Sequence, residues 1–157
     1  MANPTASQTQ TLAHTERTFQ FVASAPMERV APLFGAARER DWEHGWNPVF
    51  LWPETTTDRE GMVFTVAHGH TESVWVNTQY DVERGRFQYV YVIPDTLATV
   101  ITLSLQPRGQ ATAVTVRYDR TALNAEASSR VQAMAEQDKN AAPEWERRIN
   151  EYLNSKP

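Results

Sequence analysis

Polar and apolar residues alternate over most of the chain between residues 15 and 123. In the segment 15–24, Phe19 and Phe21 lie on one face and the polar residues between them lie on the other, which is typical of a half-buried β-strand. Turns containing glycine or proline separate the later alternating runs, and their short connections predict antiparallel pairing between neighbours. After the first strand, the predicted strands cover residues 49–53, 62–68, 72–82, 86–93, 97–106 and 111–122.

Apolar residues at helical spacing predict short helices near the N-terminus and one long helical segment at the C-terminus. The short helices are expected over residues 27–34 and 36–41, and the long segment over residues 124–154. Pro143 lacks the N–H that a helix interior needs, so we expect an irregularity at residues 139–143. The apolar stripe of the long segment consists of Val131, Met134, Ala135, Ala142, Trp145, Ile149 and Leu153.

Pairing the strands across their turns predicts which residues face the core. The predicted pairs include Tyr80 with Tyr89, Tyr91 with Thr99, and Thr99 with Tyr118, which together give one apolar and aromatic face. The opposite, polar face is predicted to carry Asn77, Gln79, Gln88, Thr102, Ser104, Thr115, Arg117 and Asp119. The sequence therefore predicts a sheet with one dry and one wet face.

The composition predicts one folded domain without covalent cross-links. The chain has 157 residues, of which 41% are hydrophobic, enough for a single core. It has no cysteine, which excludes disulfides, thiol catalysis and thiolate metal sites and suits a reducing cytoplasm. Residues 1–13 are small and polar and are expected to form a disordered tail, so the domain is predicted to cover residues 14–157.

Charge and motifs exclude several function classes. Fifteen basic and nineteen acidic residues give a net charge of -4 without a basic stripe, so nucleic acid is not an expected partner. No apolar stretch approaches the roughly 18 residues that span a bilayer, so no integral membrane association is expected. The sequence contains no nucleotide-binding glycine loop, HExxH or GxSxG motif, and we expect no cofactor.

Two histidines at a glycine turn, His68 and His70, are the strongest candidates for metal or acid–base chemistry. Residues i and i+2 of a strand share a face, but a turn at Gly69 directs the two side chains apart, and no third ligand has suitable spacing. We therefore predict no metal site. When the turn begins at Gly69, His68 falls on the dry side of its strand and becomes a candidate base or ligand donor.

The order of these elements resembles the helix-grip fold of the START and birch-pollen-allergen-like superfamily, also called SRPBCC. The segment TFQFVASAPMERV at residues 18–30 resembles the family's opening strand and helix, and VTVRYDRTAL at residues 114–123 resembles its last strand. WERRINEYL at residues 145–153 resembles its closing helix, so the likeness covers about residues 14–154. The resemblance implies an α+β domain, with a seven-stranded antiparallel sheet wrapped around a long C-terminal helix. It also implies an internal cavity.

Such a cavity would hold a small apolar or aromatic ligand between the sheet and the C-terminal helix. Tyrosines on the dry face suggest this, because a core built for packing alone has little use for hydroxyls that need partners. The candidate ligand-binding residues are Trp46, His68, Tyr80, Tyr89, Tyr91, Tyr118, Met134 and Asp138. His68 and Asp138 are also the candidate catalytic residues, and His68 and Trp46 are expected nearer an opening.

Several alternatives stay open at the level of sequence. Trp42, Trp46 and Trp52 could gate the cavity or plug the end of the sheet. The tyrosines could belong to a filled core. The resemblance also allows a polyketide cyclase- or dehydratase-like enzyme acting in the same cavity, or a protein-interaction module of the chaperone-activator type. The sequence leaves ligand identity and oligomeric state open.

Overall fold

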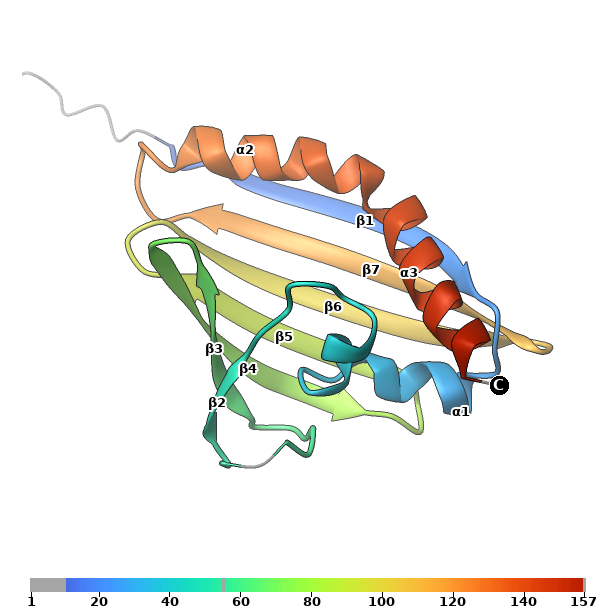
Figure 1. Ribbon diagram of the computed structural model, residues 1–157. Coiled ribbons are helices and arrows are strands. Elements are labelled where there is room, and N and C mark those ends of the chain that lie inside the picture. Colours follow the sequence, from blue (N-terminus) through green and yellow to red (C-terminus); the bar gives the residue numbers. More distant parts are fainter. Residues whose placement is uncertain (1–10, 55, 157) are drawn as a thin grey trace, which may run out of the picture.

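The computed structural model describes residues 11–54 and 56–156 and shows a curved antiparallel sheet with helices on one face (Figure 1). The strands are β1 His14–Ala23, β2 Val49–Trp52, β3 Val63–His68, β4 Thr71–Asp81, β5 Arg86–Ile93, β6 Leu97–Arg108 and β7 Ala111–Ala122. The α-helices are α1 Met27–Val30, α2 Ser128–Gln137 and α3 Ala141–Ser155, and the 3-10 helices are η1 Ala31–Phe34, η2 Arg38–Asp41 and η3 Asp138–Asn140.

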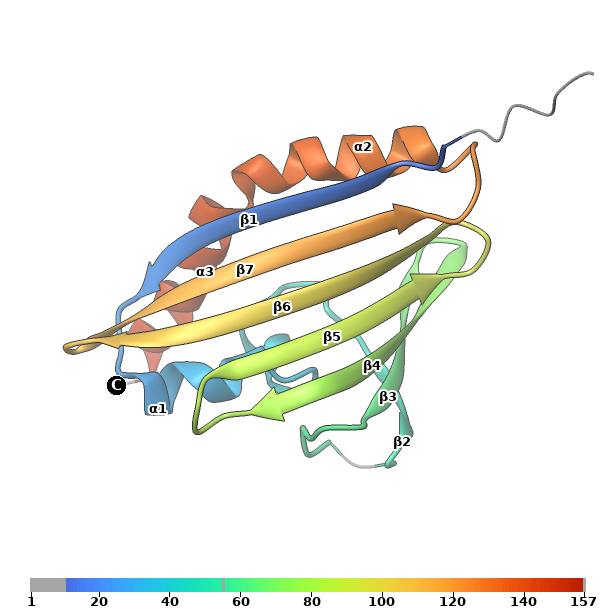
Figure 2. The ribbon, with the colours of Figure 1, turned by 180° about the vertical axis from the view of Figure 1, so that it is seen from behind.

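The sheet has the order β1-β7-β6-β5-β4-β3-β2, with every neighbouring pair antiparallel. From β2 onward it is a meander, and β1 joins at the far edge by pairing with β7. Viewed from behind, strands β1, β7, β6 and β5 lie in front and the helices α1, α2 and α3 lie beyond them (Figure 2). The seven strands and their antiparallel pairing confirm the predicted fold class.

The sheet has one buried and one solvated face, as the alternation predicts. The buried side chains of β5, β6 and β7 include Phe87, Leu103 and Val116, and they form the core with residues of α2, α3 and the short N-terminal helices. The helices α2 and α3 pack along β1, while α1 and η1 lie near the far ends of β6 and β7 (Figure 1). This arrangement leaves the concave middle of the sheet between two helical walls.

The C-terminal helical segment is interrupted, which confirms the predicted irregularity. The 3-10 turn η3 separates α2 from α3, and Pro143 is the third residue of α3. At that position proline is tolerated because the first-turn N–H groups have no helical acceptor. The break therefore precedes the proline, and it redirects α3 across the end of β1 (Figure 1).

The predicted pairing of β4 with β5 is wrong because β4 contains a bulge. Asn77 lies opposite Tyr89 and Gln79 opposite Gln88, so Thr78 is the extra residue between them. A bulge shifts the pairing and reverses which side chains face inward. As a consequence, Asn77 is fully buried rather than on the wet face, and Tyr80 pairs with Phe87 instead of Tyr89.

The β5–β6 register is as predicted, whereas the β6–β7 register is shifted by two residues. Thr99 lies opposite Arg120 rather than Tyr118. A shift of two keeps every side chain on its predicted face, and Arg120, which shares the face of Val116 and Tyr118, is buried there with 4% of its surface exposed. Arg117 and Asp119 lie on the wet face, as predicted, and hydrogen-bond to each other there.

Most of the predicted tail lies outside the described residues. Within the described part, Ala13 donates its N–H to Ser128 Oγ at 3.1 Å and accepts a hydrogen bond from the Ala122 N–H at 2.9 Å. Ordered contacts therefore begin at least one residue before the predicted boundary at residue 14. No helix in the described ranges is both long enough and apolar enough to cross a membrane.

Candidate functional site

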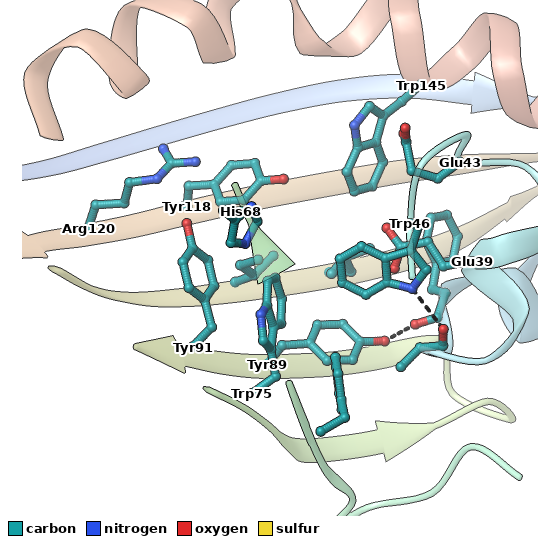
Figure 3. A pocket seen from close by; sticks show the side chains of 15 residues that line it. Glu39, Glu43, Trp46, His68, Trp75, Tyr89, Tyr91, Tyr118, Arg120 and Trp145 are labelled. Carbon is teal, nitrogen blue, oxygen red and sulfur yellow. Dashed lines mark hydrogen bonds between the residues drawn. The ribbon is translucent and has the colours of Figure 1, made fainter. Parts of the chain in front are cut away.

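A cavity of about 260 Å³ lies between the concave face of the sheet and the helices (Figure 3). Strands β3 to β7 form its floor, the segment from η1 to the loop after η2 forms one wall, and α3 contributes Trp145. The lining residues are Phe34, Ala36, Glu39, Glu43, Trp46, Phe64, His68, Trp75, Tyr89, Tyr91, Ile101, Leu103, Tyr118, Arg120 and Trp145. Eight of these fifteen residues are aromatic.

The aromatic side chains are held in place by one another. Trp75 stacks on Tyr91 with ring centroids 4.3 Å apart and on Phe64 at 5.7 Å, while Trp46 meets Trp75 edge to face at 5.4 Å. Trp145 contacts Trp42 at 5.3 Å. Offset stacking and edge-to-face contacts are the favourable aromatic geometries, so the lining is a preorganised set of rings.

The polar groups of two aromatic residues in the lining form hydrogen bonds with backbone carbonyls. The Trp46 indole donates to Ala36 O at 2.8 Å, and the Tyr89 hydroxyl donates to Phe34 O. Burial raises the pKa of Tyr89 well above its usual value, so this hydroxyl keeps its proton. Trp46 and Tyr89 therefore offer the cavity mainly ring surface.

Two carboxyl groups, Glu39 and Glu43, lie on the same side of the cavity (Figure 3). Glu43 forms a hydrogen-bonded ion pair with Arg148 of α3. Burial, together with the negative charges of Glu43 and Asp58, raises the pKa of Glu39 from 4.5 to about 8. Glu39 is thus mostly protonated at neutral pH when no cation is beside it.

Arg120 lies at the opposite side of the cavity, with Tyr91 and Tyr118 (Figure 3). Its guanidinium forms two hydrogen bonds with Asp138 of η3 and sits over the Tyr118 ring, 4.4 Å from the centroid. Burial disfavours its charge, but Asp138 and Tyr91 outweigh this effect and the pKa of Arg120 is raised. The Arg120 Nε is buried without a hydrogen-bond partner in the described part of the chain.

His68 lies at the edge of the cavity, at the end of β3. Its Nε2 is 2.9 Å from Ser73 Oγ, which also accepts from Trp75 Nε1 and lies 3.1 Å from Val66 O. A hydroxyl has one hydrogen, and when it is donated to Val66 O, Nε2 of His68 must carry the ring proton. Burial, with a contribution from Arg130, lowers the pKa of His68, so the ring is neutral at pH 7.

Comparison with solved structures identifies the architecture. No protein-family model matches the sequence, and no curated protein matches it significantly. Norcoclaurine synthase from Thalictrum flavum, in complex with dopamine and hydroxybenzaldehyde, superposes with a TM-score of 0.68 at 9% identity, over 100% of this chain and 96% of its own. This chain has the helix-grip fold.

Two further helix-grip structures agree with this assignment. A protein from Rhizobium loti superposes with a TM-score of 0.57 at 20% identity, covering 86% of this chain and 99% of its own. Ara h 8.0201 gives 0.63 at 12% identity, covering 91% and 99%. At such low identities the likeness establishes the fold, and the polyketide-cyclase branch is not singled out.

The helix-grip cavity brings together five of the eight residues that the sequence nominated. Trp46, His68, Tyr89, Tyr91 and Tyr118 line it. Tyr80, Met134 and Asp138 are not among the residues that line it.

Tyr80, Met134 and Asp138 lie outside the cavity lining for separate physical reasons. The bulge in β4 places Tyr80 against Phe87, at 5.3 Å between ring centroids, where burial raises the pKa of Tyr80 to about 12. Asp138 accepts hydrogen bonds from Arg120, which lines the cavity, and lies outside the lining itself. Met134 of α2 packs on the core beyond the cavity lining.

Sequence reasoning missed four lining residues that shape the site: Glu39, Glu43, Trp75 and Arg120. Alternation could have found Arg120, because it shares a face with Val116 and Tyr118. Trp75 was hidden by the bulge that follows it. Glu39 lies in the charged run RERD, which has the appearance of a solvated turn, and no local signal marks its place at the cavity.

The predicted tryptophan cluster separates into three roles. Trp46 lines the cavity, Trp42 is buried and donates to Leu33 O at 2.8 Å, and Trp52 is 54% exposed beneath Arg59.

His70 is exposed in the turn after His68. Three potential metal ligands, His14, Glu16 and Asp119, gather on the wet face, but Arg117 already binds both carboxylates.

Proposed function

We propose that this protein binds a small apolar or aromatic molecule in the cavity between the sheet and the C-terminal helices. The observation that carries the proposal is an unfilled space of about 260 Å³ walled by aromatic rings. Protein interiors are normally packed without such voids, because a void forfeits dispersion contacts on every side. A preformed apolar concavity with a few polar groups is the usual form of a ligand site.

The polar groups around the cavity favour binding over catalysis by the nominated pair. Catalysis by His68 and Asp138 requires both to reach one ligand. His68 instead contacts Ser73 at the edge of the cavity, and Asp138 is bound to Arg120 outside the lining. A cyclase- or dehydratase-like reaction would therefore need other groups, and Glu39, whose pKa is raised to about 8, is a candidate.

Titration with the fluorescent probe N-phenyl-1-naphthylamine tests the proposal. We expect enhanced probe emission with a Kd of about 1 µM, which corresponds to about -8 kcal/mol. Ile101→Phe places added volume in the cavity and should weaken binding at least about tenfold. Val100→Phe on the outer face of the same strand is the matched control and should bind like the wild type.

Circular dichroism should establish that both variants are folded. The proposal is contradicted by a folded wild-type protein that leaves the probe emission unchanged. It is equally contradicted when folded Ile101→Phe and Val100→Phe bind the probe with the same affinity.

A further inference from the structure

Two carboxyl groups and one guanidinium group line the cavity, and two of these three groups are paired with an opposite charge. Glu43 is paired with Arg148, and Arg120 is paired with Asp138. The Glu39 carboxyl has no hydrogen bond or ion pair within residues 11–54 and 56–156. On its side of the cavity Arg148 is paired with Glu43, so in the described ranges no cation is paired with Glu39.

The groups that face Glu39 increase this imbalance. Glu43 lies one helical turn further along the chain, and Asp58, from the loop before β3, accepts hydrogen bonds from the Ala37 and Arg38 amides. Tyr89 and Tyr118 face it from the sheet, and burial keeps both hydroxyls protonated. The nearby cations serve other acids: Arg148 pairs with Glu43, while Arg38 and Arg40 act on Asp58.

Aromatic rings lie beside this carboxyl group (Figure 3). The polar hydrogens of Trp46 and Tyr89 are donated to the carbonyl oxygens of Ala36 and Phe34. A ligand in the cavity therefore contacts the π faces of these two rings. Trp145 adds a third ring on the same side. The electron-rich face of an indole or phenol attracts a cation, and the attraction is stronger away from water. A carboxyl group beside such rings is a suitable environment for an ammonium group.

We infer that the ligand is an aromatic amine whose ammonium group binds Glu39 and whose ring lies against Trp75 and Tyr91. This inference rests on the proposed binding function and names its ligand class. The far side of the cavity accommodates such a ligand, because the charge of Arg120 is balanced by Asp138 and does not repel a cation.

Binding of the ammonium group has a consequence for protons. Without a cation, Glu39 is mostly protonated at pH 7, since its pKa is about 8. An ammonium group stabilises the carboxylate, so the Glu39 proton leaves for solvent as the amine binds. Amine affinity should therefore rise between pH 6 and pH 8, and close to one proton should be released per amine bound at pH 7.

Isothermal titration calorimetry with a matched pair of ligands tests the inference. The probes are 2-(1-naphthyl)ethylamine and 2-(1-naphthyl)ethanol, which differ in the charged group. We expect the wild-type protein to bind the amine about tenfold more tightly at pH 7.5. Glu39→Gln should abolish the preference for the amine over the alcohol, whereas Glu60→Gln, at an exposed position, should preserve that preference. Titrations in phosphate and Tris buffers report the released proton.

The outcomes separate this inference from the binding function. When the alcohol binds but the amine shows no preference, or when Glu39→Gln retains the preference, the amine assignment is overturned and the cavity still binds ligands. When neither naphthyl compound nor N-phenyl-1-naphthylamine binds the folded protein, both proposals are overturned. Proton release near zero also contradicts the pairing with Glu39.

Discussion

Arg120 of β7 and Asp138 of η3 tie the floor of the cavity to the break in the C-terminal helical segment. The two side chains are 5% and 11% exposed and share two hydrogen bonds. The break redirects α3, which carries Trp145 over the cavity. The Arg120–Asp138 ion pair thus links the floor of the cavity to the 3-10 turn η3, which directly precedes α3.

Removing one member of this pair should be costly. Asp138→Ala leaves the Arg120 charge buried without a counter-ion, and we expect a loss of about 3 kcal/mol in the free energy of unfolding. Urea denaturation monitored by tryptophan fluorescence measures the loss. Glu136 lies two residues before Asp138 and forms an exposed ion pair with Lys139. Glu136→Ala should therefore change the free energy of unfolding very little. Equal losses in the two variants would contradict the role given to Asp138.

The raised pKa of Glu39 should make stability depend on pH. The folded protein holds the Glu39 proton up to about pH 8, whereas the unfolded chain releases it near the ordinary value of 4.5. Between these values the folded state binds more protons, so stability falls as pH rises, at most by about 1.4 kcal/mol per pH unit from this group.

Urea midpoints measured from pH 5 to pH 8 test this dependence. Glu39→Gln should flatten the decline, and the exposed-site control Glu60→Gln should not. A decline that is equally steep in wild type and Glu39→Gln would show that other groups cause it.

Two tyrosines on the same strand should respond differently to loss of their hydroxyls. Tyr89→Phe removes a buried hydrogen bond to Phe34 O and should cost about 1–2 kcal/mol of stability. Tyr91 has its hydroxyl near Arg120 at the cavity, so Tyr91→Phe should change ligand preference several-fold with a smaller stability loss. Denaturation and probe titration of both variants measure this contrast. An unchanged ligand profile with a large stability loss in Tyr91→Phe would contradict it.

The hydrogen bond to Ser73 should be visible in the titration of His68. We expect a pKa below 6.5 and, in the neutral ring, a proton on Nε2, both measured by ¹⁵N-edited NMR. Because the folded state binds this proton more weakly than the unfolded chain, the stabilising contribution is complete above pH 6.5 and is lost as pH falls. Ser73→Ala should remove the tautomer preference, and a neutral ring protonated on Nδ1 in the wild type would exclude this arrangement.

Alternation and turn residues were sufficient to predict the strands, because both depend on local sequence. Five glycine- or proline-marked turns and the dry face formed by Phe87, Tyr89 and Tyr91 were readable in this way. The bulge at Thr78 was not, since the residues around it continue to alternate and nothing local announces an extra residue. This one insertion hid Trp75 and moved Tyr80.

The polar part of the site was harder to predict than its aromatic part. The tyrosines were found because they lie on regular strands with one dry face. Glu39 becomes partly buried beside the cavity because its segment lies over the sheet, a long-range contact that the charged run RERD does not encode. Arg120 and Asp138 are 18 residues apart in the sequence, so no local pattern relates them. The turn residues also left the β6–β7 register uncertain by two residues.

The central claim is that the ligand binds inside the cavity, and intermolecular nuclear Overhauser effects test it most directly. With methyl-labelled protein and naphthalene, we predict effects from the ligand to the methyl groups of Ile101 and Leu103, which line the cavity. The exposed strand β2 offers an alternative apolar surface at Val49 and Leu51, which are 58% and 51% exposed. Effects confined to Val49 and Leu51, with none to Ile101 or Leu103, would contradict the account.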